Sequence, residues 1–171
     1  SWNVPNAYNY WRPYKDENGK DISWKNYYAT KFESAVDSAK YALSRFDELS
    51  EKTERFADAL QNSSLPAPVI DAISANLSVL RSPTVLRYED GTLWGWEGCN
   101  EWSGSCEGSC QHVWNYAYAL PFLFPSLERT LRENTMRYGL MESGATHFRI
   151  PLPLGREAKL FRACLDGQMG E

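Results

Sequence analysis

Apolar residues recur at helical spacing over two stretches of the first half of the chain. From about Thr30 to Leu60 they are three, four or seven residues apart, as on one face of an amphipathic helix. The polar run 61–64 ends this stretch, and Ser64 is a candidate N-cap for a second helix over 66–80, which Pro83 ends. We therefore expect a long helix followed by a shorter one. The apolar positions are Phe32, Val36, Ala39, Leu43, Phe46, Leu49, Phe56 and Leu60, then Val69, Ile70, Ile73, Leu77 and Leu80.

The period of the pattern changes after Pro83. Asp90-Gly91 lies between two short β-prone runs, which predicts a hairpin whose turn needs a positive φ. A Gly- and Ser-rich loop over 98–111 follows. The next helical pattern runs from about 113 to 136, and its two internal prolines predict a kink or a restart near Phe124.

The two ends of the chain have weaker patterns. Residues 1–28 are expected to be irregular, with a turn at 17–19, and residues 146–154 to be extended. Asp166-Gly167 indicates another turn. The chain is therefore expected to be mainly α, with short β-hairpins inserted. Because the third helix is apolar nearly all round from 116 to 124, we expect partner helices beyond Glu171, so that the chain is part of a larger protein.

Composition narrows the classes of partner. The chain has 171 residues, of which 23 % are charged, and a formal net charge of -4, which argues against nucleic acid or an anionic membrane surface as partner. The longest apolar runs, such as 118–124, are too short to span a bilayer. No signal-peptide pattern follows Ser1, and export stays open. Aromatic residues make up 14 %, which suits an aromatic-rich core or stacking against sugar rings.

Three of the four cysteines are close together in sequence. Cys99, Cys106 and Cys110 have the spacing C-x6-C-x3-C, and Cys164 is far from them. This spacing fits structural zinc poorly, although His112 offers a fourth ligand. A disulfide between loop cysteines is an alternative if the protein is exported. The interpretation that we favour is small buried thiols in a tight loop, with no metal and no cofactor.

Glu97 is the acid with the most informative surroundings. It follows Trp94 and Trp96 at the end of a predicted strand and precedes Gly98, where the chain can turn sharply. Aromatic surroundings raise the pKa of a carboxyl group, whereas hydrogen bonds and positive charges lower it, and glycoside hydrolysis depends on such tuning of two carboxyl groups. The alternative is a surface glutamate in a hairpin.

The run "QHVWNY" offers groups suited to a sugar. Gln111, His112 and Asn115 carry hydrogen-bonding groups near the start of a predicted helix, and Trp114 adds a ring. The competing interpretation of His112 is a helix cap. These residues would form the wall opposite Glu97.

Several of these segments are similar to one known family. "TLWGWEGCNEW", followed by "CEGSCQHVWNYAYALPFLFPSLERTLRE", resembles the catalytic region of glycoside hydrolase family 116, which contains non-lysosomal glucosylceramidase and bacterial β-glucosidases. "NYYATKFESAVDSAKYAL", "NLSVLRSPTVLRYEDG" and "FRACLDGQMGE" resemble neighbouring parts of that region. The resemblance covers essentially the whole chain, and the run 95–133 is its specific part.

The resemblance implies both a fold and a mechanism. It implies the first part of an (α/α) six-hairpin toroid barrel behind an upstream β-sandwich, with 1–62 as linker and long helix and 63–171 as the N-terminal part of the barrel. It implies a retaining mechanism with Glu97 as nucleophile and an acid/base Asp beyond the end of the chain. In the glucosylceramidase branch, an Asp that binds the sugar aligns with Gln111 here, so the sugar is left open.

We therefore expect a fragment of a retaining β-glycosidase that is inactive in isolation. The substrate would be a β-glucoside or related glycoside, and the rest of the parent chain would be needed to complete the fold. Besides Glu97, the expected substrate contacts or supporting residues are His112, Asn115, Gln111, Trp96, Trp114 and Asp166, with Asp166 at the pocket rim. The alternatives are a non-catalytic carbohydrate-binding protein and a structural module stabilised by zinc or disulfides.

Overall fold

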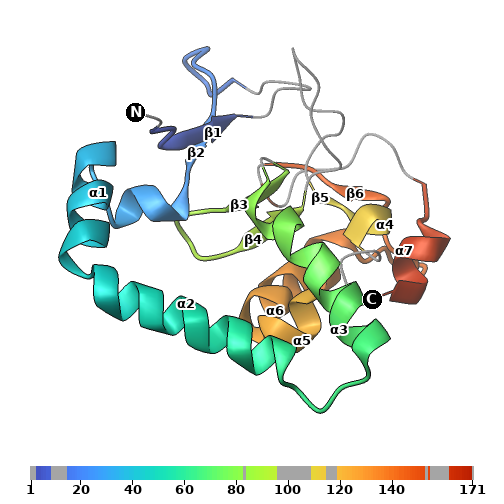
Figure 1. Ribbon diagram of the computed structural model, residues 1–171. Coiled ribbons are helices and arrows are strands. Elements are labelled where there is room, and N and C mark those ends of the chain that lie inside the picture. Colours follow the sequence, from blue (N-terminus) through green and yellow to red (C-terminus); the bar gives the residue numbers. More distant parts are fainter. Residues whose placement is uncertain are drawn as a thin grey trace.

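The computed structural model describes residues 3–8, 15–82, 84–95, 109–114, 119–152, 154 and 162–170. Most of the regular structure in this part is helical, and the strands form two-stranded antiparallel pairs (Figure 1). The predicted mainly α composition with short hairpins therefore matches these residues. That the helices form the first part of an (α/α) toroid stays a prediction.

The elements are short and follow one another closely. The strands are β1 (Asn6–Tyr8), β2 (Ser23–Lys25), β3 (Val85–Arg87), β4 (Leu93–Gly95), β5 (Ser109–Cys110) and β6 (Arg149–Ile150). The α-helices are α1 (Ala35–Ser44), α2 (Phe46–Gln61), α3 (Ala67–Asn76), α4 (Gln111–Trp114), α5 (Ala119–Leu123), α6 (Pro125–Asn134) and α7 (Leu165–Gly170). The 3-10 helices η1 (Tyr27–Thr30) and η2 (Leu77–Arg81) and the π-helix η3 (Thr135–Gly139) complete them.

The predicted long helix is two helices. Its backbone leaves the helical region at Arg45 (φ −123°, ψ 25°), where α1 ends and α2 begins. The Arg45 side chain donates hydrogen bonds to the Tyr41 hydroxyl of α1 and to the Glu48 carboxylate of α2. These contacts stabilise the bend, and the spacing of apolar residues gives no information about them. We call α1 and α2 together the helical arm.

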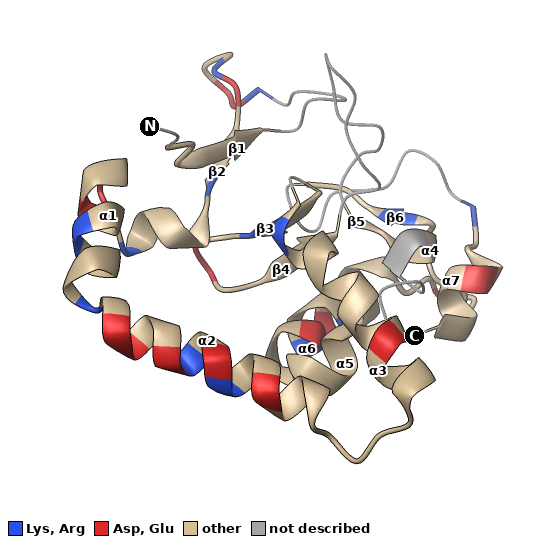
Figure 2. Ribbon diagram, viewed as in Figure 1, with Lys and Arg blue, Asp and Glu red and all other residues tan. Residues whose placement is uncertain are grey.

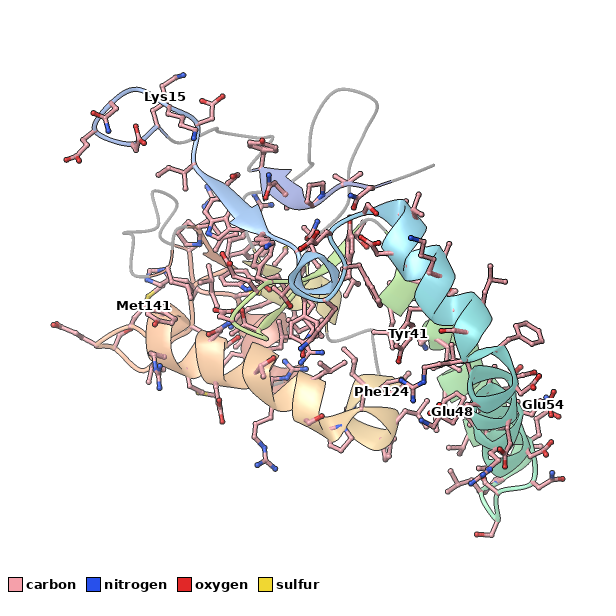
Figure 3. All side chains as sticks on the ribbon, turned by 90° about the vertical axis from the view of Figure 1, so that its left-hand side faces the viewer. Lys15, Tyr41, Glu48, Glu54, Phe124 and Met141 are labelled. Atoms are coloured by element: carbon pink, nitrogen blue, oxygen red, sulfur yellow. The ribbon has the colours of Figure 1, made fainter. Side chains whose placement is uncertain are left out.

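The helical arm is mostly exposed. Neither helix contains a buried residue, and the side chains of Val36, Leu43 and Phe46 are 58 %, 76 % and 64 % exposed. The arm runs along one side of the molecule in Figure 1. It meets the rest of the protein where the Phe56 ring stacks on the Phe124 ring, with centroids 5.9 Å apart, and Figure 3 shows Phe124 at the end of α6 that faces α2.

The second predicted helix is confirmed as α3, which η2 extends. Its N-cap is Pro66, so the prediction of Ser64 as cap is wrong. Pro66 has non-helical backbone angles (φ −56°, ψ 141°), with φ fixed by its ring, and its side chain makes no capping hydrogen bond. The nearby hydroxyl of Ser63 accepts a hydrogen bond from the N–H of Leu65 instead.

The predicted hairpin is confirmed and lies at the centre of the fold. β3 and β4 are antiparallel, and Gly91 in their turn has φ 90°. Successive side chains of a strand face opposite sides, so the hairpin contributes to two clusters. One cluster contains Trp94 with Ala7, Tyr88, Ile150 and Leu152, and the other contains Leu93 with Leu120 and Leu131.

The helical pattern that was predicted over 113–136 is interrupted. Phe124 has non-helical backbone angles (φ −136°, ψ 56°), and Pro125 starts α6, which confirms the predicted restart. Before it, α4 covers only Gln111–Trp114, and residues 115–118 lie outside the described part. At its other end α6 continues into η3.

Two expectations for the ends of the chain need correction. Residues 1–28 contain the antiparallel pair β1–β2, although the turn before Gly19 (φ 77°) is confirmed. Asp166-Gly167 is not a turn but lies within α7. Gly167 is there because α7 packs closely: a Cβ at this position would lie 2.5 Å from Cys164 Sγ. The extended tail is confirmed where β6 pairs with β5.

Candidate functional site

Three of the predicted site residues have described side chains: Gln111, His112 and Asp166. Glu97, Trp96 and Asn115 lie outside the described residues, as does the side chain of Trp114. The site is therefore built from α4 and α7, which pack against each other on the side of the molecule away from the helical arm (Figure 1).

The start of α4 is fixed by the neighbouring strand. β5 leads directly into α4 and pairs with β6. One residue further, the N–H of Gln111 donates to the carbonyl of Phe148 over 3.2 Å. Gln111 is only 3 % exposed, which places its side chain in the interior, whereas His112 is partly exposed. The predicted position of His112 in the first turn of a helix is thus confirmed, whereas Gln111, predicted in the loop, is already part of α4.

The start of α7 is fixed from the other side. The N–H of Cys164 donates to the carbonyl of Thr146 over 3.1 Å, and the Gln168 side-chain amide donates to the carbonyl of Gly144 over 3.0 Å. Gly167 faces α4, because a Cβ added to it would lie 2.9 Å from the Cβ of Gln111. Close packing between the two short helices therefore depends on this glycine.

These contacts bring four polar side chains together, which we call the Asp166 cluster: Gln111, His112, Cys164 and Asp166. The Asp166 Oδ2 atom is 3.6 Å from His112 Nδ1, and Asp166 Oδ1 accepts a hydrogen bond from Cys164 Sγ over 3.3 Å. The His112 ring also lies against the Phe148 ring, with centroids 4.8 Å apart. The His112 side chain is 29 % exposed and that of Asp166 is 59 % exposed, so both reach the surface.

The electrostatics of the cluster keep a thiol next to a carboxylate. Burial, and then the hydrogen bond to Asp166, raise the pKa of the Cys164 thiol to about 11. The hydrogen bond from Cys164, with smaller contributions from the backbone N–H of Gly167 and the His112 charge, lowers the pKa of Asp166. At neutral pH Cys164 is therefore a hydrogen-bond donor. Since the thiolate is the nucleophilic form of cysteine, this environment does not suit a cysteine nucleophile.

The cysteine alternatives are partly resolved. Cys110 and Cys164 are both buried, as the buried-thiol interpretation expects, and Cys164 is a thiol that donates a hydrogen bond to Asp166. The disulfide alternative for the loop cysteines stays a prediction. Cys99 and Cys106 lie outside the described residues. Within the described ranges, no group of three or more His, Cys, Asp or Glu side chains could hold a metal ion. In the same part of the chain, no helix is both long and apolar enough to cross a membrane.

The strand that leads toward Glu97 ends beside this site. Gly95 is the last residue of β4, and its N–H and carbonyl both lie 3.4 Å from the Ser109 hydroxyl. β4 also contacts α4. The predicted strand side and the predicted helix side of the site are thus adjacent up to the last described residue before Glu97.

Sequence reasoning did not assign Cys164, Phe148 or Gly167 to the site. The hydrogen bond of Cys164 and the ring contact of Phe148 depend on the pairing of distant segments, for which the sequence carries no local signal. Gly167 is visible in the sequence as part of Asp166-Gly167. That dipeptide predicts a turn, whereas the structure uses the glycine for close packing between two helices.

No protein-family model matches the chain, and neither a curated protein nor a solved structure matches it. The Asp166 cluster and the sequence resemblance are therefore the basis for the function. Chemically, the cluster offers an ionised carboxylate and an imidazole at the surface, which suit the hydroxyl groups of a polar, neutral ligand.

Proposed function

We propose that this chain contributes the nucleophile side of a retaining β-glycosidase that acts on β-glucosides or related glycosides, glucosylceramide-like ones among them. Glu97 is the proposed nucleophile, and the helices are the proposed first part of an (α/α) toroid. The observation that supports this most directly is the contact of Gly95 with Ser109. It joins the strand before Glu97 to β5, the strand that leads into the helix with His112.

The chain itself limits how far Glu97 is from this contact. Consecutive Cα atoms are about 3.8 Å apart, so two residues carry the Cα of Glu97 at most about 7.6 Å from that of Gly95. Two residues separate Ser109 from His112. Under the proposal, a glycoside bound beside the Asp166 cluster meets a carboxylate at position 97, which is the arrangement that the resemblance implies.

The reaction would proceed in two displacements. The Glu97 carboxylate attacks the anomeric carbon while the bond to the leaving oxygen breaks, and a carboxylic acid protonates that oxygen. The same acid, now a carboxylate, takes a proton from water as the water attacks the glycosyl ester and releases Glu97. The two carboxyl groups of a retaining pair are about 5–5.5 Å apart.

Asp166 does not fit the role of the acid in that pair. A general acid at neutral pH needs a raised pKa, and the hydrogen bond from Cys164 lowers that of Asp166. Asp166 is instead suited to remain ionised, and the proposal keeps it at the rim of the site, the position expected from the sequence. The acid is therefore assigned to the downstream Asp that the resemblance implies.

The test is covalent trapping in the full-length protein. A 2-deoxy-2-fluoro-β-glucoside with a good leaving group should form a stable ester on Glu97, which peptide mass spectrometry locates. Glu97→Gln should abolish labelling and lower turnover of an aryl β-glucoside by several orders of magnitude, because the amide is a poor nucleophile. Azide should partly restore turnover in Glu97→Ala.

Glu101→Gln is the matched control, since it makes the same change four residues away. It should leave labelling of Glu97 intact. Glucose binding without labelling of any carboxylate would replace the proposal with a non-catalytic carbohydrate-binding protein. Labelling of a carboxylate other than Glu97 would overturn the residue assignment alone.

A further inference from the structure

Two positively charged side chains share one aromatic ring at the turn end of the β3–β4 hairpin. The Arg87 Cζ atom is 3.8 Å from the centroid of the Tyr27 ring, and the Lys31 Nζ atom is 5.3 Å from the same centroid. Arg87 is the last residue of β3, whereas Tyr27 begins η1 and Lys31 is its C-cap. We call these three side chains the Tyr27 platform.

Backbone contacts fix the segment that carries the ring against the hairpin. The N–H of Glu89 donates to the carbonyl of Lys25 over 2.9 Å, and Asn26 and Tyr88 form a β-bridge. In Figure 1 the segment between β2 and α1 lies beside the turn of this hairpin. The platform therefore joins elements that are far apart in sequence, and it lies at the opposite end of the hairpin from Gly95.

The guanidinium of Arg87 is held in one orientation by two contacts. Its Nε atom donates a hydrogen bond to the carbonyl of Gly91 over 3.1 Å, and its carbon lies over the Tyr27 ring. Its two terminal nitrogens make no hydrogen bond to any described residue. A guanidinium fixed in this way is preorganised to bind an oxyanion through two parallel N–H···O hydrogen bonds.

The positive charges of the platform are not compensated by a carboxylate. In the part of the chain that the structure describes, neither Arg87 nor Lys31 forms an ion pair, unlike the arginines that pair with glutamates on α2 and α6. Glu89, the acid nearest to Arg87 in sequence, is exposed and does not pair with it. An aromatic ring attracts a cation through its quadrupole but carries no net charge. Both charges are therefore available to an anionic ligand.

We propose that the Tyr27 platform binds the phosphate group of a small-molecule phosphate monoester. Arg87 supplies the planar pair of donors, Lys31 supplies the second charge, and Tyr27 holds both. Such a phosphate carries nearly two negative charges at neutral pH, which matches two uncompensated cations better than a carboxylate does. The formal net charge of -4 disfavours an anionic membrane surface, so the ligand is a soluble phosphate rather than a lipid headgroup. The proposal does not depend on Glu97.

Isothermal titration calorimetry on the full-length protein tests the site with ethyl phosphate as probe. The titration is made at about pH 7.5 and low salt, where a monoester with a second pKa of about 6 is mainly a dianion. Ethyl phosphate should bind with a stoichiometry of one. Diethyl phosphate, which carries one negative charge, should bind more weakly, and added salt should weaken both because the site is at the surface.

Four variants assign the binding to the platform. Arg87→Ala should weaken it by about tenfold or more, since it removes charge-assisted hydrogen bonds. Arg81→Ala is the matched control, because Arg81 is also exposed and unpaired among the described residues but lies over no ring, and it should leave binding unchanged. Tyr27→Leu should weaken binding several-fold, whereas Tyr27→Phe keeps the ring and should retain it.

Arg87→Ala should leave covalent labelling of Glu97 intact, which shows that the variant is folded. If it does not fold, Arg87→Lys keeps the charge but not the planar pair of donors, and it should weaken binding as well. A wild type that does not bind ethyl phosphate would overturn the proposal, as would equal losses in Arg87→Ala and Arg81→Ala. Binding to phosphatidylcholine vesicles that contain phosphatidic acid, without binding of ethyl phosphate, would replace the soluble ligand with a lipid.

Discussion

The helical arm has a clear sequence pattern but exposed residues, whereas the Asp166 cluster has no clear pattern but contains buried residues. The arm has the clearest periodicity in the chain, and its helices form, but none of its residues is buried. The cluster has almost no periodicity, yet two of its four residues, Gln111 and Cys164, are at most 3 % exposed. Periodicity thus identified helices, whereas burial followed from the pairing of distant segments.

The charges of the two regions differ in the same way. Figure 2 shows acidic and basic residues side by side along α2, and the ion pairs there join residues three or four apart, such as Glu48 with Arg45 and Lys52. The Asp166–His112 pair joins residues that are far apart in sequence. Local pairs support a single helix, whereas the long-range pair holds two segments in place.

The largest effect should come from truncating one buried leucine outside the helical arm, compared with one exposed leucine within the arm. Leu120 is fully buried in the cluster with Leu93 and Leu131, and Leu120→Ala should lower the free energy of unfolding by about 2–5 kcal/mol. Leu43 is 76 % exposed, and Leu43→Ala should change the free energy of unfolding by less than about 0.5 kcal/mol. Urea unfolding followed by circular dichroism measures both. A similar loss in the two variants would mean that Leu43 is buried in solution and would remove the contrast.

A smaller effect is expected from adding a methyl group between α4 and α7. Gly167→Ala places a Cβ 2.5 Å from Cys164 Sγ and 2.9 Å from the Cβ of Gln111, and such overpacking costs about 1–3 kcal/mol. Gly139→Ala is the matched control, because its Cβ meets Ile150 at an ordinary 3.5 Å. Urea midpoints compare the two, and alkylation of Cys164 should accelerate only in Gly167→Ala. Equal midpoints would show that the two helices separate at little cost.

The smallest effect concerns the acid stability of the helical arm. Hydrogen bonds from Arg45 and Lys52 lower the pKa of Glu48 from about 4.5 to about 2. A lowered pKa stabilises the fold above the ordinary value, and this contribution is lost as the pH falls from about 4.5 to about 2. Because Glu48 is at the surface, the contribution is small and screened by salt.

The midpoint of urea unfolding, measured from pH 7 to pH 2 for the wild type and Glu48→Gln, shows this contribution. The difference between the two proteins should shrink over that window. Glu54→Gln is a suitable control, since the Glu54 carboxylate accepts a hydrogen bond from Ser50, a neutral donor (Figure 3). A difference for Glu48→Gln that stays constant with pH would contradict the pKa assignment.

The parts of the fold that the sequence predicted are those set by local chemistry. The turn glycines Gly19 and Gly91 adopt positive φ, and Pro125 restarts the helix after Phe124. The errors came from contacts between elements. The break at Arg45 is held by side chains on both of its sides, and Gly167 serves close packing rather than a turn.

The site could be predicted only in part for the same reason. Gln111, His112 and Asp166 were each selected from their local sequence, and the structure brings all three together. Their proximity depends on β5 pairing with β6 and on Cys164 bonding to Thr146, which no short motif encodes. Glu97 was selected from its aromatic neighbours and the resemblance, and its role stays a prediction.

The contact of Gly95 with Ser109 also has a consequence for how this sequence can vary. It joins two positions that are 14 residues apart in sequence, and the entropic cost of bringing such positions together grows only with the logarithm of the length between them. Doubling that length would cost about 0.6 kcal/mol, less than the loss of one buried methylene. The contact between Gly95 and Ser109 should therefore tolerate a change in the length of the sequence between them at little cost in closure entropy.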